Sequence, residues 1–209
     1  MPPVESATRN TPIVAILRGL TPDRASSVGA ALRGAGIRIL EVPLNSPEPY
    51  RSIEILAAES GQDCLVGAGT VLSVEQVERT VAAGGRLMVS PNTNPLVIRA
   101  ALARGMQVMP GFATASEAFA AVDAGAQILK LFPAATYGPK HLRALREVLP
   151  AGTQIYPVGG IGAADVEPWL EAGAGGFGFG SELFKPQFTL EEITARAARV
   201  VQALATRPS

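Results

Sequence analysis

Lys130 lies inside a run of apolar residues, 128–132, that is typical of a fully buried strand. Side chains alternate between the two faces of a strand, so Lys130 shares a face with Ile128 and Phe132, which we expect to point inward. Loss of water around a buried lysine favours the free amine, and only the free amine can attack a carbonyl. Lys130 is therefore predicted to form an imine; a buried ion pair with Glu41 is the structural alternative.

Three further polar residues stand at the ends of predicted strands. Glu41 in RILEVPL is a carboxylate within a strand, which requires either a partner or a function. Arg18 in ILRGL belongs to the same set of strand ends, although it could simply form an ion pair at the rim. Thr70 in GAGTV could contact a ligand or cap a helix.

Other chemistries have few residues available. His141 is the single histidine and lies in a predicted helical segment, where we expect it to be exposed or hydrogen-bonded. One histidine cannot build a three-histidine metal site, and Cys64 has no partner nearby in the sequence. We expect no metal and no cofactor, although a magnesium site made only of carboxylates stays open.

Strands and helices alternate along the chain. Glycines that follow segments of helical period are typical of helix C-caps, namely Gly36, Gly61, Gly84, Gly105, Gly125, Gly152 and Gly173. A short apolar run follows each of them, and TPIVAIL near the start adds an eighth strand. Eight strands at a spacing of roughly 20 to 27 residues predict a single compact (β/α)8 TIM barrel over residues 1–209, with flexible tails at 1–11 and 206–209. An open doubly wound sheet is the alternative, which the missing GxGxxG turn weakens.

In such a barrel the catalytic groups project from the C-terminal ends of the strands. The residues at those ends are Arg18, Glu41, Thr70, Pro91, Asn92, Gly111, Lys130, Gly159, Gly160, Gly180 and Ser181. The glycine-rich stretches YPVGGIGAADV, which contains Ile161, and GFGFGSELF each lead toward a helix, so they predict a phosphate site; permissive turns are the alternative. Phe132 would keep the amine dry, or it would only pack in the interior.

Composition limits the class of partner. Eighteen Lys and Arg residues balance eighteen Asp and Glu residues, and no basic block marks a nucleic-acid face. No apolar run approaches the roughly 18 to 20 residues that cross a bilayer. The first residues lack the pattern of a secretory signal. We therefore expect a cytoplasmic protein without a nucleic-acid or membrane partner.

Eight stretches, in order from about residue 12 to residue 185, resemble the 2-keto-3-deoxy-6-phospho sugar acid aldolase family: VAILRG, LEVPLNSP, VGAGTV, SPNTNP, MPGFATASEA, LKLFPA, VGGI and GFGFGS. The resemblance implies that Lys130 is the Schiff-base lysine and Glu41 the proton-transfer group. It also implies that the pyruvate part of a phosphorylated 2-keto-3-deoxy sugar acid contacts Arg18 and Thr70, and that the phosphate contacts Gly160, Gly180 and Ser181. By the same resemblance the protein is a metal-free class I aldolase and a homotrimer.

Asn45 separates two branches of that family. Gluconate-type enzymes typically carry an arginine four residues after the catalytic glutamate, in a stretch like EVTLRT, whereas this chain has EVPLNSP. The galactonate-type branch is the one it resembles, which implies cleavage of 2-dehydro-3-deoxy-6-phosphogalactonate to pyruvate and glyceraldehyde 3-phosphate. The alternatives are the gluconate epimer, a phosphosugar isomerase or synthase on the same barrel, and a non-enzymatic sugar-phosphate binding protein.

Overall fold

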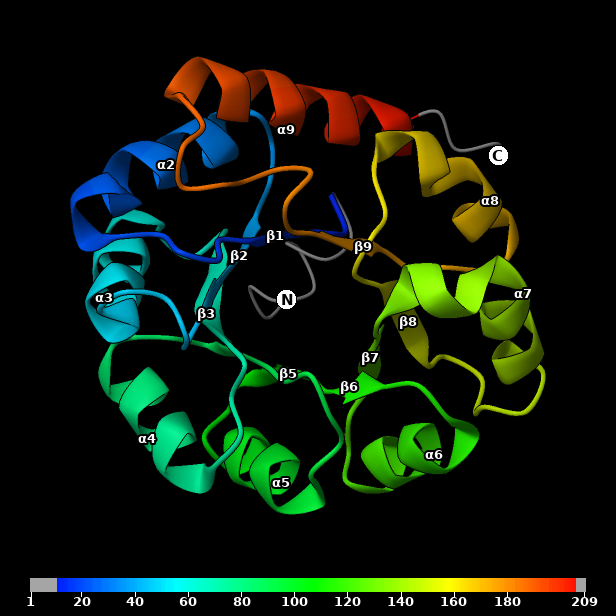
Figure 1. The fold of residues 1–209 in the computed structure, drawn as a ribbon. Helices are drawn as coiled ribbons and strands as arrows, with labels where there is room; N and C mark the ends of the chain where they lie inside the picture. The colour runs from blue at the N-terminus through cyan, green and yellow to red at the C-terminus, as the bar shows by residue number, and fades with distance from the viewer. Residues whose placement is uncertain (1–10, 206–209) are drawn as a thin grey trace.

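The computed structural model describes residues 11–205, in which short central strands are surrounded by helices (Figure 1). The strands are β1 Ile13–Ile16, β2 Ile39–Pro43, β3 Leu65–Gly69, β4 Leu87–Val89, β5 Gln107–Met109, β6 Gly111–Phe112, β7 Ile128–Leu131, β8 Gln154–Pro157 and β9 Phe177–Phe179. The helices are α2 Pro22–Gly34, α3 Pro49–Glu59, α4 Val74–Ala82, α5 Pro95–Ala103, α6 Ala115–Asp123, α7 Ala134–Arg146, the 3-10 turn η1 Ala163–Asp165, α8 Val166–Glu171 and α9 Leu190–Ala205. The predicted tails, 1–11 and 206–209, lie outside the described residues except for Thr11.

Capping chemistry fixes where several helices begin. The Ser73 hydroxyl accepts a hydrogen bond from the N–H of Gln76 at the start of α4, and Asn94 accepts one from Leu96 at the start of α5. At α6, Thr114 and Glu117 form a reciprocal capping box. These side chains satisfy N–H groups that a first helical turn leaves free. Because each helix starts close behind a strand, the residues at the strand ends stay on one face of the molecule.

The strands form two parallel sheets, so the prediction of a closed eight-stranded barrel is wrong. One sheet has the order β5-β4-β3-β2-β1-β9, and the other has the order β6-β7-β8. The predicted fifth strand, MQVMPG, is divided at Pro110 into β5, which pairs with β4, and β6, which pairs with β7. Proline has no N–H with which to continue a ladder. At the other junction, just beyond Pro157 at the end of β8, an isolated bridge joins Val158 to Gly178.

The two faces of each strand pack against different partners. Leu129 and Leu131 of β7 belong to the main core that the helices share, whereas Ile128 belongs to a second apolar cluster built from strand residues. Alternation therefore points Lys130 toward the interior of the ring of strands, as the sequence predicts. The same argument places Glu41 of β2 there. Both residues are buried: Lys130 is 7% exposed and Glu41 is 1% exposed.

Candidate active site

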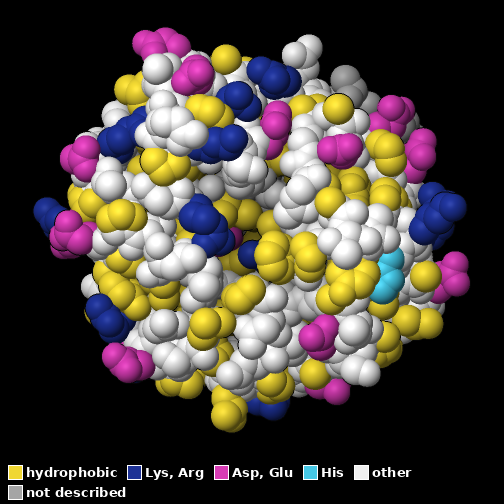
Figure 2. Space-filling model, in the orientation of Figure 1, with side chains coloured by type: hydrophobic (Ala, Val, Ile, Leu, Met, Phe, Trp, Pro, Cys, Tyr) yellow, Lys and Arg dark blue, Asp and Glu magenta, His cyan; other side chains and the backbone are white. Residues whose placement is uncertain are grey.

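A pocket opens at the C-terminal ends of the strands. The face seen in Figure 2 is hollowed near its centre, with basic and apolar side chains around the hollow. The lining residues are Ile16, Arg18, Thr70, Pro91, Lys130, Phe132, Val158, Gly159, Gly160, Ile161, Gly178, Gly180 and Ser181. Strand ends that are far apart in the sequence thus meet around one cavity, as parallel strands in a ring of this kind require.

Lys130 presents a buried amine to this pocket. Its backbone is fixed between Gly111 of β6 and Tyr156 of β8, and its N–H donates to the Pro110 carbonyl at 2.9 Å. The Nζ atom lies 5.1 Å from the centroid of the Phe132 ring. Lys130 takes part in none of the ion pairs between described side chains. The amine is therefore directed at the cavity by a rigid strand and is not held by a salt bridge.

Glu41 lies buried beside the pocket without lining it. Its Oε2 atom has no hydrogen-bond partner. Burial raises the pKa of Glu41 above its ordinary value, and the positive charges of Lys130 and Arg18 act in the opposite direction. A carboxyl group whose pKa is moved toward neutrality, and which keeps a free oxygen, is suited to taking up and releasing protons.

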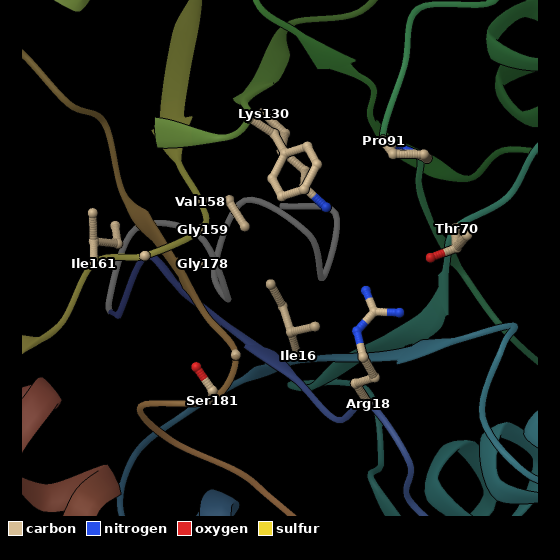
Figure 3. A pocket seen from close by; sticks show the side chains of 13 residues that line it. Ile16, Arg18, Thr70, Pro91, Lys130, Val158, Gly159, Ile161, Gly178 and Ser181 are labelled. Atoms are coloured by element: carbon tan, nitrogen blue, oxygen red, sulfur yellow. The ribbon is translucent and has the colours of Figure 1, made fainter. Parts of the chain in front are cut away.

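Arg18 stands at the mouth of the pocket and is held by the loop that follows β2. Its Nη1 atom donates a hydrogen bond of 2.6 Å to Oδ1 of Asn45. One residue further along each loop, the Gly19 N–H donates to the Ser46 hydroxyl at 3.0 Å. Figure 3 shows the Arg18 guanidinium, the Lys130 amine and the Thr70 hydroxyl turned toward one another across the cavity. A guanidinium and a hydroxyl at one end suit a carboxylate.

Thr70 reaches the pocket in a backbone conformation that β-branched residues rarely adopt. Its φ is 57°, in the left-handed region, immediately after the last residue of β3. Strain of this kind costs about 1–3 kcal/mol and is retained where surrounding structure enforces it. The turn directs the Thr70 hydroxyl into the cavity, on the same side as Pro91 of the next strand end.

The opposite end of the pocket is built mostly from main chain. Gly159 and Gly160 have φ values of 98° and 73°, and a Cβ atom at Gly160 would lie 2.7 Å from that of Ala135. Both residues therefore depend on being glycine. Ser181 and Ile161 flank this end, on the side away from Arg18 (Figure 3). Exposed main chain and one hydroxyl, without a carboxylate in the lining, suit an anion such as a phosphate group.

The structure thus brings the residues predicted to bind substrate around one cavity, with Glu41 next to it, whereas Asn92 and Gly111 of the strand-end set do not line that cavity. The sequence argument missed Ile16, Val158 and Gly178, which also line the pocket. Apolar and glycine residues carry no chemical signal of their own, but their positions on the inner faces of β1 and β9 and just after β8 could have identified them.

The histidine and metal chemistry considered in the sequence analysis finds no site in the described residues. The Nε2 atom of His141 is within 2.8 Å of the Ala113 carbonyl oxygen, and its ring stacks on Tyr137, so this histidine is satisfied locally. Within residues 11–205 no group of three or more His, Cys, Asp or Glu side chains is arranged to hold a metal ion. No helix in that range is long and apolar enough to span a membrane.

Comparison with known proteins gives consistent matches over nearly the whole chain. The family model for KDPG and KHG aldolases matches residues 4–200. The probable 2-dehydro-3-deoxy-6-phosphogalactonate aldolase of Rhizobium meliloti strain 1021 is 46% identical over 97% of this chain and 93% of its own length. The 2-dehydro-3-deoxy-6-phosphogalactonate aldolase of Escherichia coli strain K12 is 44% identical over 92% of this chain and 94% of its own. A solved native KDPGal structure superposes with a TM-score of 0.91 at 43% identity, covering 93% of this chain and 94% of that one.

Proposed function

Because this chain belongs to the KDPG and KHG aldolase family, we propose that it cleaves 2-dehydro-3-deoxy-6-phosphogalactonate to pyruvate and glyceraldehyde 3-phosphate through an imine on Lys130. The protein is an aldolase and therefore a lyase. The observation that carries the mechanism is the buried Lys130 amine, which faces the pocket without an ion-pair partner and lies close enough to Glu41 for their charges to interact.

Lys130 begins the reaction by attacking the C2 ketone of the substrate. The carbinolamine that forms loses water to give an iminium ion, which draws the electrons of the C3–C4 bond toward nitrogen. Glu41, directly or through a water molecule, removes the proton from the C4 hydroxyl as that bond breaks. Glyceraldehyde 3-phosphate leaves with its new aldehyde at the former C4.

An enamine remains on Lys130 after cleavage. A proton returned by Glu41 to C3 converts it to the iminium ion of pyruvate, and water then attacks C2 and releases pyruvate with the free amine. Glu41 thus acts first as base and then as acid. Burial raises the pKa of this carboxyl group, which makes it a better proton acceptor than an ordinary carboxylate and supports its role as base.

The chemistry of the two pocket ends supports one orientation of the substrate in this proposal. Arg18 and Thr70, on the side of Lys130, would bind the carboxylate next to the C2 ketone. Gly159, Gly160 and Ser181 would bind the phosphate, with Gly180 and Ile161 completing that wall. Pro91 and Phe132 would exclude water around the imine.

The proposal extends to the assembly and the location of the protein. We propose a homotrimer, as the family resemblance implies. Leu72 and Leu96, at the starts of α4 and α5, are 48% and 73% exposed and could contact a second subunit. Light scattering of the purified protein tests this number of subunits. A cytoplasmic location is part of the proposal, and cell fractionation tests it.

Reduction by borohydride in the presence of pyruvate tests the proposed chemistry. We expect a covalent pyruvyl adduct on Lys130, its loss in Lys130→Met, and its retention in the control Lys140→Met, which changes an exposed lysine. No adduct in the parent protein would favour a phosphosugar isomerase or synthase. Turnover measured with the two C4 epimers side by side decides between the galactonate and gluconate acids.

A further inference from the structure

Gly69 is the last residue of β3 and lies directly against the side chain of Glu41. A Cβ atom at this position would stand 1.7 Å from Oε1 and 2.4 Å from Cδ of Glu41. Such distances are far inside van der Waals contact, so the carboxyl group occupies the space that any other residue would fill. We propose that Gly69 is a positioning residue for Glu41; the role in catalysis rests on the function proposed above.

The register of β2 and β3 explains this contact. Glu41 pairs with Gly67, and Gly69 follows two residues later on the same inner face of the sheet. The two glycines serve different neighbours, because a Cβ at Gly67 would meet the backbone of Leu87 on β4, whereas one at Gly69 would meet only the glutamate side chain among its three nearest atoms. Gly67 brings two strands together, and Gly69 leaves room for one carboxyl group.

In the described structure the space beside Gly69 is filled by the Glu41 carboxyl group. Glu41 is 1% exposed and cannot turn to solvent without leaving the interior. Its Oε2 atom has no hydrogen-bond partner, and Oε1 is the atom nearest to the Cβ that any other residue would place at position 69. The residue that follows, Thr70, enters the pocket through its left-handed turn. Two adjacent residues thus set the carboxylate and supply a polar wall of the cavity.

Replacement of Gly69 by alanine should displace the carboxyl group without touching Lys130. We expect kcat for aldol cleavage to fall about 10- to 100-fold, because a shift of about 1 Å in a reacting group can cost 100-fold. Borohydride trapping of pyruvate on Lys130 should stay close to the parent level, since imine formation needs the amine. Gly34→Ala, at an exposed helical site with nothing within 4 Å, is the control and should leave both measurements unchanged.

A double-mutant cycle with Glu41→Ala separates the contact from a general effect of alanine in β3. Without the glutamate side chain, Gly69→Ala should no longer lower the melting temperature. If Gly69→Ala alone does not fold, a folded Gly69→Ala/Glu41→Ala protein still assigns the failure to this contact. An equal loss of melting temperature in both backgrounds, or an unfolded double variant, would overturn the proposal.

The double-mutant cycle measures the contact between Gly69 and Glu41 through the melting temperature, even if the protein does not form an imine. Failure of pyruvate trapping in the parent would therefore reject the proposed function and leave the steric relationship measurable. Conversely, normal trapping and unchanged kcat in a folded Gly69→Ala protein would reject the positioning role and leave the aldolase mechanism intact.

Discussion

The Arg18 guanidinium donates a 2.6 Å hydrogen bond to the Asn45 amide oxygen, and this bond links the loops that follow β1 and β2. In the gluconate-type pattern an arginine stands at the position of Asn45. Here the residue supplies an acceptor in place of a second guanidinium, and it orients the arginine that remains. The neighbouring bond from Gly19 to Ser46 fixes the same two loops through the main chain.

Asn45→Ala should raise KM for the phosphorylated acid about 3- to 10-fold, because an exposed hydrogen bond to a charged group contributes about 1 kcal/mol. Arg18 would lose its orientation but keep its charge, so kcat should change little. Asn45→Asp should raise KM further, since an ionised partner neutralises the guanidinium. Steady-state kinetics of both variants test this; a parent-like KM in Asn45→Ala would mean that Arg18 needs no support.

Glu41→Gln should stabilise the protein at neutral pH. The pKa of Glu41 is raised on folding from its ordinary value of 4.5, chiefly by burial, so the ionised form opposes folding. A raised carboxyl pKa contributes stability below 4.5 and loses it as the pH rises through the folded value. The melting temperature of Glu41→Gln should therefore exceed that of the parent at neutral pH, and the difference should shrink as the pH falls toward 4.5.

The control for this pH dependence is Glu147→Gln, which changes an exposed carboxylate at the end of α7. It should show no comparable gain. Thermal unfolding of all three proteins across the pH range makes the comparison. A lower melting temperature for Glu41→Gln at every pH would show that the attraction of Lys130 and Arg18 outweighs burial.

Ser181→Ala should weaken binding of the phosphate end. The loss of one hydroxyl donor to a dianion costs about 1–3 kcal/mol and should appear in KM. Gly160→Val should be more severe, because φ is 73° and the added Cβ would meet Ala135. Both variants should still trap pyruvate, which has no phosphate to misplace.

Gly105→Val provides the matched control for backbone strain. Gly105 has a φ of 70° and nothing within 4 Å of a Cβ, and it lies outside the pocket lining. It should lose stability without any rise in KM. If pyruvate trapping collapsed in Gly160→Val while KM for the phosphorylated acid held, the substrate would lie in the reverse orientation.

Thr70→Gly should weaken substrate binding and stabilise the folded protein. Relief of a left-handed β-branched residue returns about 1–3 kcal/mol, more than the about 0.5–1 kcal/mol that glycine loses through chain freedom. The unfolding free energy should rise while KM also rises, because the hydroxyl is gone. Thr153→Gly, at a residue outside the left-handed region, should only destabilise. Denaturant unfolding that shows a loss for Thr70→Gly would indicate that Thr70 is not strained.

The positions of the strands and of the site were predictable because the sequence marks them locally. Apolar runs bounded by glycine and proline located each strand, and alternation alone pointed Lys130 inward. Residues with distinctive chemistry at strand ends, such as Arg18 and Thr70, then fell around one cavity.

The connection between strands was not predictable in the same way. Pro110 lies within an otherwise regular apolar run, and its missing N–H divides that strand between two sheets. The bond from Arg18 to Asn45 depends on how two loops meet, and the contact of Gly69 with Glu41 depends on strand register. Each of these is a property of pairs of segments, which local patterns do not record.

Gly159 and Gly160 also bear on how this pocket can change over evolutionary time. Their wall of the cavity consists of main chain without side chains. Almost any substitution there would therefore disrupt the wall instead of changing which ligand it prefers. The opposite wall, with Arg18, Thr70 and Pro91, is made of replaceable side chains. Divergence toward new substrates should therefore accumulate on that side, while the glycine side is inherited nearly unaltered.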